Sequence, residues 1–132
     1  MFDLALNDIR ALYEGGISRT GWAGCIRKED VALWSNENDL SIDQTFDAIG
    51  VALAYAYANG SLDWDFCDSA ANDLFGVLMQ FYTDSECHVE ESKLFWKYYL
   101  AFDHSETVEP SQADETARAA IGEFLSELPV TM

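Results

Sequence analysis

The segment from Ser41 to Gly60 constrains the fold of this chain more than any other. Ser41 and Gln44 have the spacing of a capping box, and Asn59-Gly60 supplies a helix stop. Between these ends, apolar side chains fall on two opposite faces of a helix: Ile42, Phe46, Ile49, Leu53, Ala56 and Tyr57 on one, and Val51, Tyr55 and Ala58 on the other. A helix that is apolar on nearly all sides must be covered by other elements, so the segment predicts a central, buried helix.

Helical spacing of apolar residues also dominates the rest of the chain. Further helices are predicted over residues 2–14, 28–35, 63–82, 86–102 and 112–128. Residues 15–27 hold four glycines and predict a long loop or a short β excursion, residues 103–110 predict a linker, and Ser111 is a candidate cap for the last helix. Because the glycine-terminated turns are short, we expect antiparallel neighbours. The sequence therefore predicts an all-α fold, a compact bundle of five or six helices in a single domain that covers residues 1–132.

The charge of the chain is strongly segregated. Its formal charge is −17, from 24 acids and 7 bases, yet no lysine or arginine occurs between Glu29 and Glu91. Fourteen carboxylates fall within residues 29–92: Glu29, Asp30, Glu37, Asp39, Asp43, Asp47, Asp63, Asp65, Asp68, Asp73, Asp84, Glu86, Glu90 and Glu91. Unscreened like charge destabilises a compact state. We therefore expect a strongly basic partner that offsets this cost.

The bulk composition excludes several classes of protein. With 49% hydrophobic and 14% aromatic residues, the chain is too rich in core material for a disordered acidic protein. Its few scattered bases give no counter-charge for direct binding of nucleic acid or of an anionic membrane. No apolar stretch is long enough to span a bilayer, and the first residues lack the cationic start of a signal peptide. The odd set of Cys25, Cys67 and Cys87 predicts free thiols, and so a cytoplasmic location.

The densest group of carboxylates, Asp63, Asp65, Asp68 and Asp73, allows two interpretations. One is a divalent-metal site with oxygen ligands, although the spacing does not match a calcium-binding loop. The other is that acids in the first turn of a helix stabilise its dipole. The second interpretation also covers Asp39 and Asp43, and Glu86, Glu90 and Glu91. It accounts for where the acids are, but not for the missing bases.

Motifs of catalysis and of transition-metal binding are missing from the sequence. Cys87 and His88 are adjacent, so on a helix they diverge by about 100° and cannot easily face one point, and His104 lies a helix away. The sequence contains no Gly-x-Ser-x-Gly, no His-Glu-x-x-His and no phosphate-binding loop. We therefore expect no enzyme, no cofactor and no metal site.

Aromatic residues next to acids predict a protein-binding surface. Trp22 and Trp34 are the least securely buried tryptophans by pattern, and Tyr55 and Tyr57 lie on different faces of one helix. The alternative, that these rings simply pack in the core, stays open. The candidate partner-binding residues are Trp34, Glu37, Asp39, Asp43, Asp47, Asp65, Asp68 and Asp73.

The middle half of the chain resembles a known class of small acidic proteins. The capped segment from Ser41 through Asp47 to Tyr55, followed by Leu62-Asp63-Trp64-Asp65-Phe66-Cys67-Asp68, is similar in style to the immunity proteins of bacterial toxin systems, of the contact-dependent inhibition type. These proteins share no diagnostic motif, so the resemblance assigns no residue a role. It implies a toxin inhibitor whose partner is a basic toxin domain, an RNase or a DNase.

Two alternatives to an immunity protein stay open. A phage-type acidic DNA mimic, which inhibits a restriction or CRISPR effector, predicts carboxylates spaced like phosphates along an elongated surface. A small metal hydrolase would use Asp63, Asp65 and Asp68 as ligands. The bulky aromatic core favours a compact globule over an elongated mimic.

Overall fold

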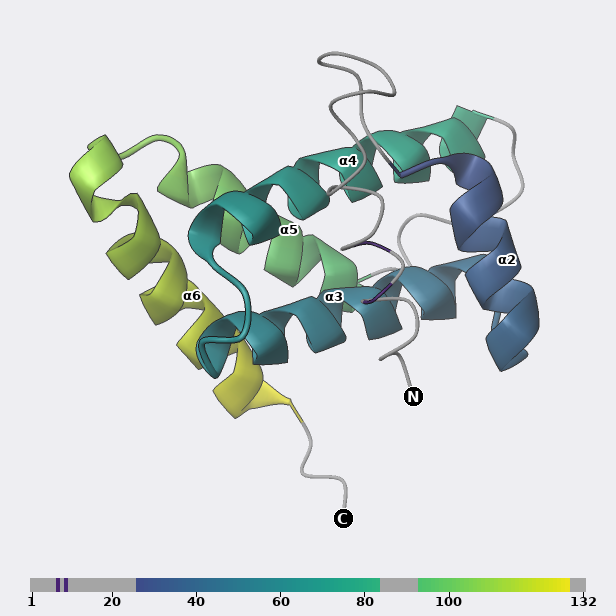
Figure 1. Ribbon diagram of the computed structural model, residues 1–132, viewed down its shortest axis with the longest axis horizontal. Helices are drawn as coiled ribbons and strands as arrows, with labels where there is room; N and C mark the ends of the chain where they lie inside the picture. The colour runs from purple at the N-terminus through teal and green to yellow at the C-terminus, as the bar shows by residue number, and fades with distance from the viewer. Residues whose placement is uncertain (1–6, 8, 10–25, 84–92, 129–132) are drawn as a thin grey trace.

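Five α-helices form the described part of the protein (Figure 1). The structure, a computed structural model, describes residues 26–83 and 93–128 together with Asn7 and Ile9. In chain order the helices are α2 (Lys28–Asn38), α3 (Ile42–Ala58), α4 (Trp64–Thr83), α5 (Lys93–Ser105) and α6 (Ala113–Glu127), with a 3-10 turn η2 (Pro110–Gln112) before α6. The described residues contain no strand, and the predicted all-α bundle is confirmed. Most of the predicted helix over residues 2–14 and of the glycine-rich segment lies outside the described residues, although Ile9 is helical and fully buried.

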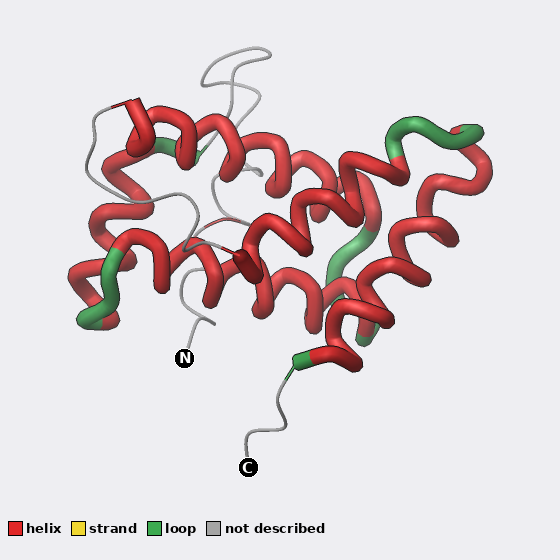
Figure 2. Tube along the Cα trace, turned by 180° about the vertical axis from the view of Figure 1, so that it is seen from behind, coloured by secondary structure: helices red, strands yellow, loops and turns green. Residues whose placement is uncertain are grey.

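Helix α3 lies at the centre of the bundle and packs against all four other α-helices (Figures 1 and 2). The predicted capping box is confirmed: Gln44 N donates to Ser41 Oγ at 3.1 Å, and Ser41 N donates to Gln44 Oε1 at 3.0 Å. The predicted stop is confirmed as well, since α3 ends at Ala58 and Gly60 takes a left-handed φ of 84°.

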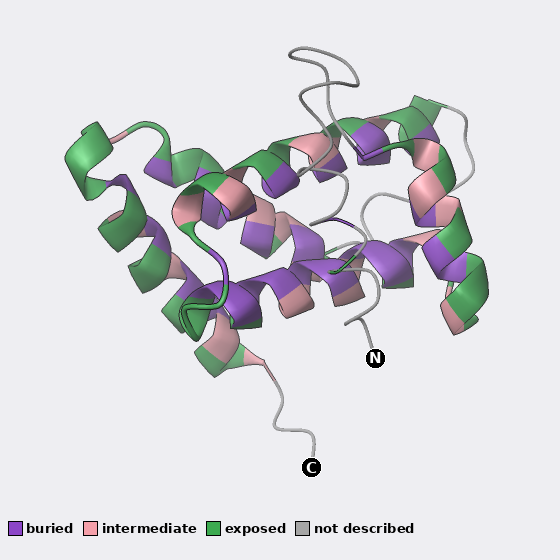
Figure 3. Cartoon of the chain, viewed as in Figure 1, coloured by how far each residue is buried: buried purple, intermediate pink, exposed green. Residues whose placement is uncertain are grey.

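The prediction that α3 is covered on nearly all sides is only partly correct. Phe46, Ile49 and Leu53 are fully buried, as Figure 3 shows by the purple inner face of the helix. The opposite face reaches solvent, because Tyr55 is 52% exposed and Ala58 is exposed. The other four helices therefore cover the inner face of α3 and leave Tyr55 and Ala58 open to solvent.

Contacts with α5 show in which direction α3 and α4 run relative to it. Asp47 and Tyr57, near the two ends of α3, contact Phe95 and Phe102 of α5 in the same order, so these two helices are parallel. Helix α4 runs the other way, because Trp64 at its start bonds to the end of α5 while Phe75 stacks near the start of α5. The predicted antiparallel pairing of α3 with α4 follows.

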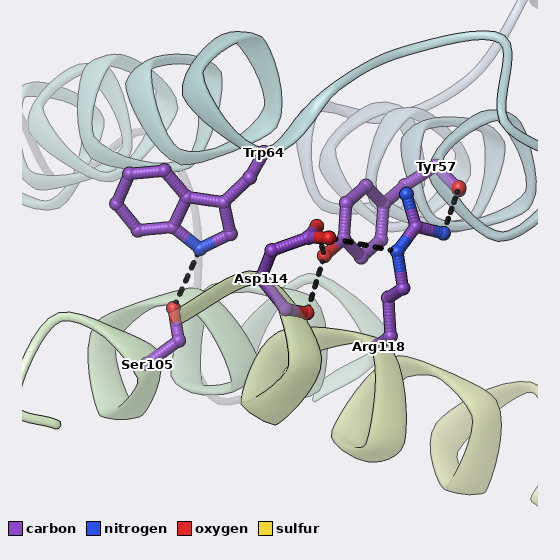
Figure 4. A network of polar contacts seen from close by, with 5 residues as sticks. All are labelled: Tyr57, Trp64, Ser105, Asp114 and Arg118. Atoms are coloured by element: carbon purple, nitrogen blue, oxygen red, sulfur yellow. Dashed lines mark hydrogen bonds and ion pairs between the residues drawn. The ribbon is translucent and has the colours of Figure 1, made fainter. Parts of the chain in front are cut away.

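A polar network joins the α3–α4 hairpin to α5 and α6 (Figure 4). The Tyr57 hydroxyl bonds to the carboxylate and the backbone carbonyl of Asp114, and the Arg118 guanidinium bonds to Asp114 and lies 4.6 Å from the Tyr57 ring centre. Trp64 Nε1 donates to Ser105 Oγ at 2.9 Å. Tyr57 and Ser105 are fully buried, so leaving either hydroxyl unpaired would carry the desolvation cost of a polar group without a partner.

Three predicted helix boundaries differ from the structure. Helix α2 continues to Asn38 rather than residue 35, and α5 continues to Ser105 rather than residue 102. Ser111 does not cap α6, because Pro110 opens a 3-10 turn that contains Ser111 and places Gln112 at the N-cap position without a side-chain cap. The first residues predicted for the 86–102 helix lie outside the described residues.

Within the described residues, no helix combines the length and the apolar character that crossing a membrane requires.

The close approach of α3 and α5 at Gly50 predicts a stability effect. A Cβ at Gly50 would lie 3.1 Å from the Phe95 backbone Cα, so Gly50→Ala must push the two helices apart. We expect a net loss of about 1–3 kcal/mol in the free energy of unfolding, because overpacking outweighs the gain in helix propensity. Chemical denaturation with circular dichroism measures it.

Gly122→Ala is the matched control for this variant. Gly122 lies within α6, is exposed, and has open space where a Cβ would go. The Gly122→Ala variant should be more stable than the unsubstituted protein by about 0.5–1 kcal/mol, through helix propensity alone. Equal stabilisation by both variants would contradict the tight α3–α5 contact.

Candidate protein-binding surface

A group of carboxylates meets where α4 passes the end of α5. Asp65 and Asp68 come from the first turns of α4, Asp103 comes from the last turn of α5, and Glu106 directly follows that helix. Asn72 holds the group together, since its Nδ2 donates to Glu106 Oε2 at 2.8 Å and to the Asp68 backbone carbonyl at 3.0 Å. We call these four acids the α4–α5 acidic group.

The carboxyl groups of Asp68 and Glu106 shift each other's pKa in opposite directions. Asp68 Oδ1 is buried and meets no hydrogen-bond donor among the described residues. Burial, and then the neighbouring Glu106 carboxylate, raise the pKa of Asp68 to about 8, while the hydrogen bond from Asp68 lowers the pKa of Glu106. The raised pKa of Asp68 and the lowered pKa of Glu106 both favour a neutral Asp68 that donates a hydrogen bond to an ionised Glu106. This is the usual outcome for two adjacent carboxyl groups.

Three aromatic rings lie beside the α4–α5 acidic group. Phe75 of α4 stacks on Tyr99 of α5, with ring centres 4.5 Å apart and planes 12° apart. Trp96 meets both rings edge-on, at 5.4 Å from Phe75 and 5.7 Å from Tyr99. All three side chains are half-buried, so part of each ring faces solvent.

The rings and the acids form one continuous surface. Burial raises the pKa of Tyr99, and the carboxylates of Asp103, Glu106 and Asp68 raise it further because they disfavour a second negative charge nearby. A tyrosine that senses all three acids lies among them. We call the three rings together with the α4–α5 acidic group the α4–α5 face.

Several residues predicted to bind a partner are instead part of the structure of the bundle. Trp34 is only 2% exposed and lies in the core with Val31, which agrees with the alternative that its ring packs inside the bundle. Asp43 is only 7% exposed. Asp47 is half-buried and caps α5, since its Oδ1 accepts from Phe95 N at 3.0 Å, and burial raises its pKa. None of these three presents a free side chain to a protein partner.

The remaining predicted residues divide between two ends of the molecule. Glu37 and Asp39 are exposed at the end of α2, whereas Asp65 and Asp68 lie on α4 (Figure 1). The 17 residues of α3, about 25 Å of helix, separate the two groups. Asp73 is half-buried on α4 and interacts within the chain. One continuous acidic surface from α2 to α4, as the predicted set implied, does not form.

Sequence analysis missed half of the α4–α5 face. It assigned Asp103 and Glu106 to a linker and did not single out Trp96 or Tyr99. A signal was present: Trp96, Tyr99, Asp103 and Glu106 repeat at steps of three, four and three residues, which keeps them on one side of a helix. Helix α4 carries the same spacing in Asp65, Asp68, Asn72 and Phe75.

The possible metal and thiol sites find no geometric support in the described residues. No three His, Cys, Asp or Glu side chains there are placed to hold a metal ion. Asp63, a candidate ligand, caps α4 instead, because its Oδ1 accepts from Phe66 N at 2.8 Å. Cys67 is buried, and burial raises the pKa of its thiol to about 12. Trp22, Cys25, Cys87 and His88 lie outside the described residues.

A shallow groove of about 320 Å³ separates α5 from α6. Leu100 and Phe124 form part of its floor, and Lys97 pairs with Glu127 across it at 3.2 Å. Lys97 and His104 of α5 line this groove together with Glu123 and Glu127 of α6. The groove therefore holds side chains of both charges.

No family model matches the chain, and neither the curated proteins nor the solved structures contain a significant match to it.

The shared proton predicts how stability depends on pH. Between about pH 4 and pH 8 the folded pair holds a proton that the unfolded chain has released, so this pair makes the protein less stable as the pH rises through that range. Asp68→Asn removes the titration and can still donate to Glu106. The melting temperature of the variant, relative to the unsubstituted protein, should increase by a few degrees between pH 5 and pH 9.

Glu37→Gln is the control for this measurement, because it removes an exposed carboxylate at the other end of the bundle. The difference in melting temperature between Glu37→Gln and the unsubstituted protein should stay nearly constant with pH. A constant difference for Asp68→Asn as well would show that the pair does not hold a proton at neutral pH.

Proposed function

We propose that this protein is a stoichiometric inhibitor that binds and neutralises a basic toxin domain, with a nuclease as the leading candidate, in the manner of an immunity protein. The α4–α5 face carries the proposal. It combines four carboxylates with three half-exposed aromatic rings, and no described lysine or arginine interrupts it. This combination fits a protein that presents cationic side chains.

The placement of the bases supports recognition rather than general solubility. A highly charged surface suffices for solubility whatever its pattern. Here Lys97 is paired with Glu127, and Arg118 is paired with Asp114 and stacked on Tyr57, all away from the α4–α5 face. Lys97 and Arg118 are thus held by other contacts, and no described lysine or arginine pairs with an acid of the face.

Binding of this kind can neutralise a nuclease without chemistry. Carboxylates fixed on rigid helices attract a basic domain over long distances and speed association. Once bound, they occupy the cationic groove that otherwise holds the phosphates of the substrate. The aromatic rings supply the desolvated contact that gives such interfaces most of their affinity.

Co-expression tests the proposal directly. The product of the gene next to that of this protein is expressed alone and together with it in a bacterial host. We expect the neighbouring product to be basic and toxic, growth to recover on co-expression, and a one-to-one complex to elute from size exclusion. A non-toxic neighbour that forms no complex would contradict the proposal, and recovery of a large DNA-binding effector would favour the DNA mimic.

Charge reversal on the α4–α5 face should slow association with that partner. Asp65 and Asp103 are both exposed, so changing both to lysine should leave the fold intact. We expect the association rate to fall by about tenfold and its dependence on salt to flatten. Stopped-flow or surface plasmon resonance at several salt concentrations measures both.

The matched control is the double change of Glu37 and Asp39 to lysine at the end of α2. It alters the net charge by the same amount, from −17 to −13, because each change from acid to lysine adds two. A small effect is expected, since the lost charges lie about 25 Å away, beyond the Debye length of roughly 8 Å at physiological salt. Equal effects of both double variants would mean that only net charge matters.

A further inference from the structure

The ring cluster on the α4–α5 face has geometry that suits a cation. Cations bind over an aromatic ring face at about 6 Å or less from its centre. Phe75, Trp96 and Tyr99 are half-buried, and Tyr99 stacks on Phe75 and, at 6.3 Å, on Phe95. The carboxylates of Asp103 and Glu106 are close enough to Tyr99 to raise its pKa. A positive charge there would meet ring faces and carboxylates together.

The described part of the chain places no cation of its own over these rings. It uses such contacts elsewhere: Lys28 Nζ lies 5.0 Å from the ring centre of Phe81, and the Arg118 guanidinium lies 4.6 Å from that of Tyr57. Among the described residues, no lysine or arginine covers Phe75, Trp96 or Tyr99. A cation from another molecule would complete this surface.

We infer that the α4–α5 face binds an arginine side chain of a basic protein segment, with the guanidinium against the ring cluster and its N–H groups directed to Asp103 and Glu106. Arginine fits better than lysine. Its planar group stacks on rings and donates two parallel hydrogen bonds to a carboxylate, whereas the lysine ammonium is a compact, strongly hydrated point charge. The inference rests on the proposed function, because it names the chemistry of the partner that the same surface takes.

Arginine binding should release a proton. Burial, and then the nearby Glu106 carboxylate, raise the pKa of Asp68 to about 8, and Asp68 Oδ1 has no hydrogen-bond partner among the described residues. The charged or titratable groups around the pair are Asp65 on α4 and Tyr99 and Asp103 on α5. A guanidinium beside these groups favours ionised carboxylates, so the Asp68 O–H bond breaks and the proton passes to the buffer.

Two matched peptides test the inference without the toxin. One alternates four arginines with glycines, and the other has lysine in place of each arginine. Fluorescence anisotropy with labelled peptides at low salt measures both dissociation constants. We expect tighter binding of the arginine peptide by about threefold or more.

Substitution of the aromatic rings tests whether they cause the preference for the arginine peptide. Tyr99→Leu keeps the net charge and should remove the preference for the arginine peptide. If Tyr99→Leu does not fold, Trp96→Leu replaces it and should also remove the preference. The control is Tyr55→Leu, at a tyrosine that is 52% exposed on α3, and this variant should still prefer the arginine peptide. Equal binding of both peptides, or a preference that persists in Tyr99→Leu and Trp96→Leu, would overturn the inference.

Calorimetry provides the second readout. Titration of the arginine peptide at pH 7, in phosphate and in Tris, should give binding enthalpies that differ by the ionisation enthalpy of the released proton, and Asp68→Asn should abolish this difference. If a toxin complex forms but the arginine preference is absent, the proposed function stands and this inference fails. If the preference is present but no toxin is found, the arginine site stands and the proposed function fails.

Discussion

The contact between α3 and α5 at Gly50 is the constraint on which the rest of the bundle depends. A residue without a side chain lets the Phe95 backbone approach α3, and three residues earlier Asp47 caps the start of α5. The two interactions fix the separation and the axial position of one helix pair. Once α3 and α5 are parallel and close, the short hairpin after Gly60 returns α4 antiparallel to both, and α6 covers their remaining side.

The same geometry brings like charges together. Because α4 runs antiparallel to α5, the acids at the start of α4 meet the acids at the end of α5. The amide of Asn72 donates to Glu106, the pKa of Asp68 is raised, and no described lysine or arginine pairs with these acids. A local conflict of this kind, within a fold whose caps and core are otherwise consistent, is typical of functional surfaces.

Local signals predicted the helices well, whereas contacts between helices could not be read from the sequence. The capping box at Ser41 and Gln44 involves residues three apart, so the sequence contains both partners side by side. Asp47 looked like any surface acid, because its partner at Phe95 lies 48 residues away. Trp34 looked exposed because its neighbours in the chain are polar, although its own helix turns it into the core.

The α4–α5 face was only partly predictable for a related reason. The acids of α4 were evident from their density, but their partners on α5 depended on where that helix ends. A helix that ends at residue 102 leaves Asp103 in a linker, whereas one that ends at Ser105 aligns Asp103 with Trp96 and Tyr99. Helix ends depend on tertiary contacts, and here Trp64 bonds to Ser105 and stabilises the last turn.

The faces of α5 explain why net charge alone is a poor description of this protein. Lys97 and His104 line the groove beside α6, whereas Trp96 and Tyr99 pack against Phe75 of α4. A basic partner that sensed only a charge of −17 could dock in many orientations. Lys97 and Arg118 form ion pairs within the chain, and no described lysine or arginine pairs with Asp65, Asp103 or Glu106. Under the proposed function, specificity comes from this pattern of pairing and from the adjoining rings rather than from the total charge.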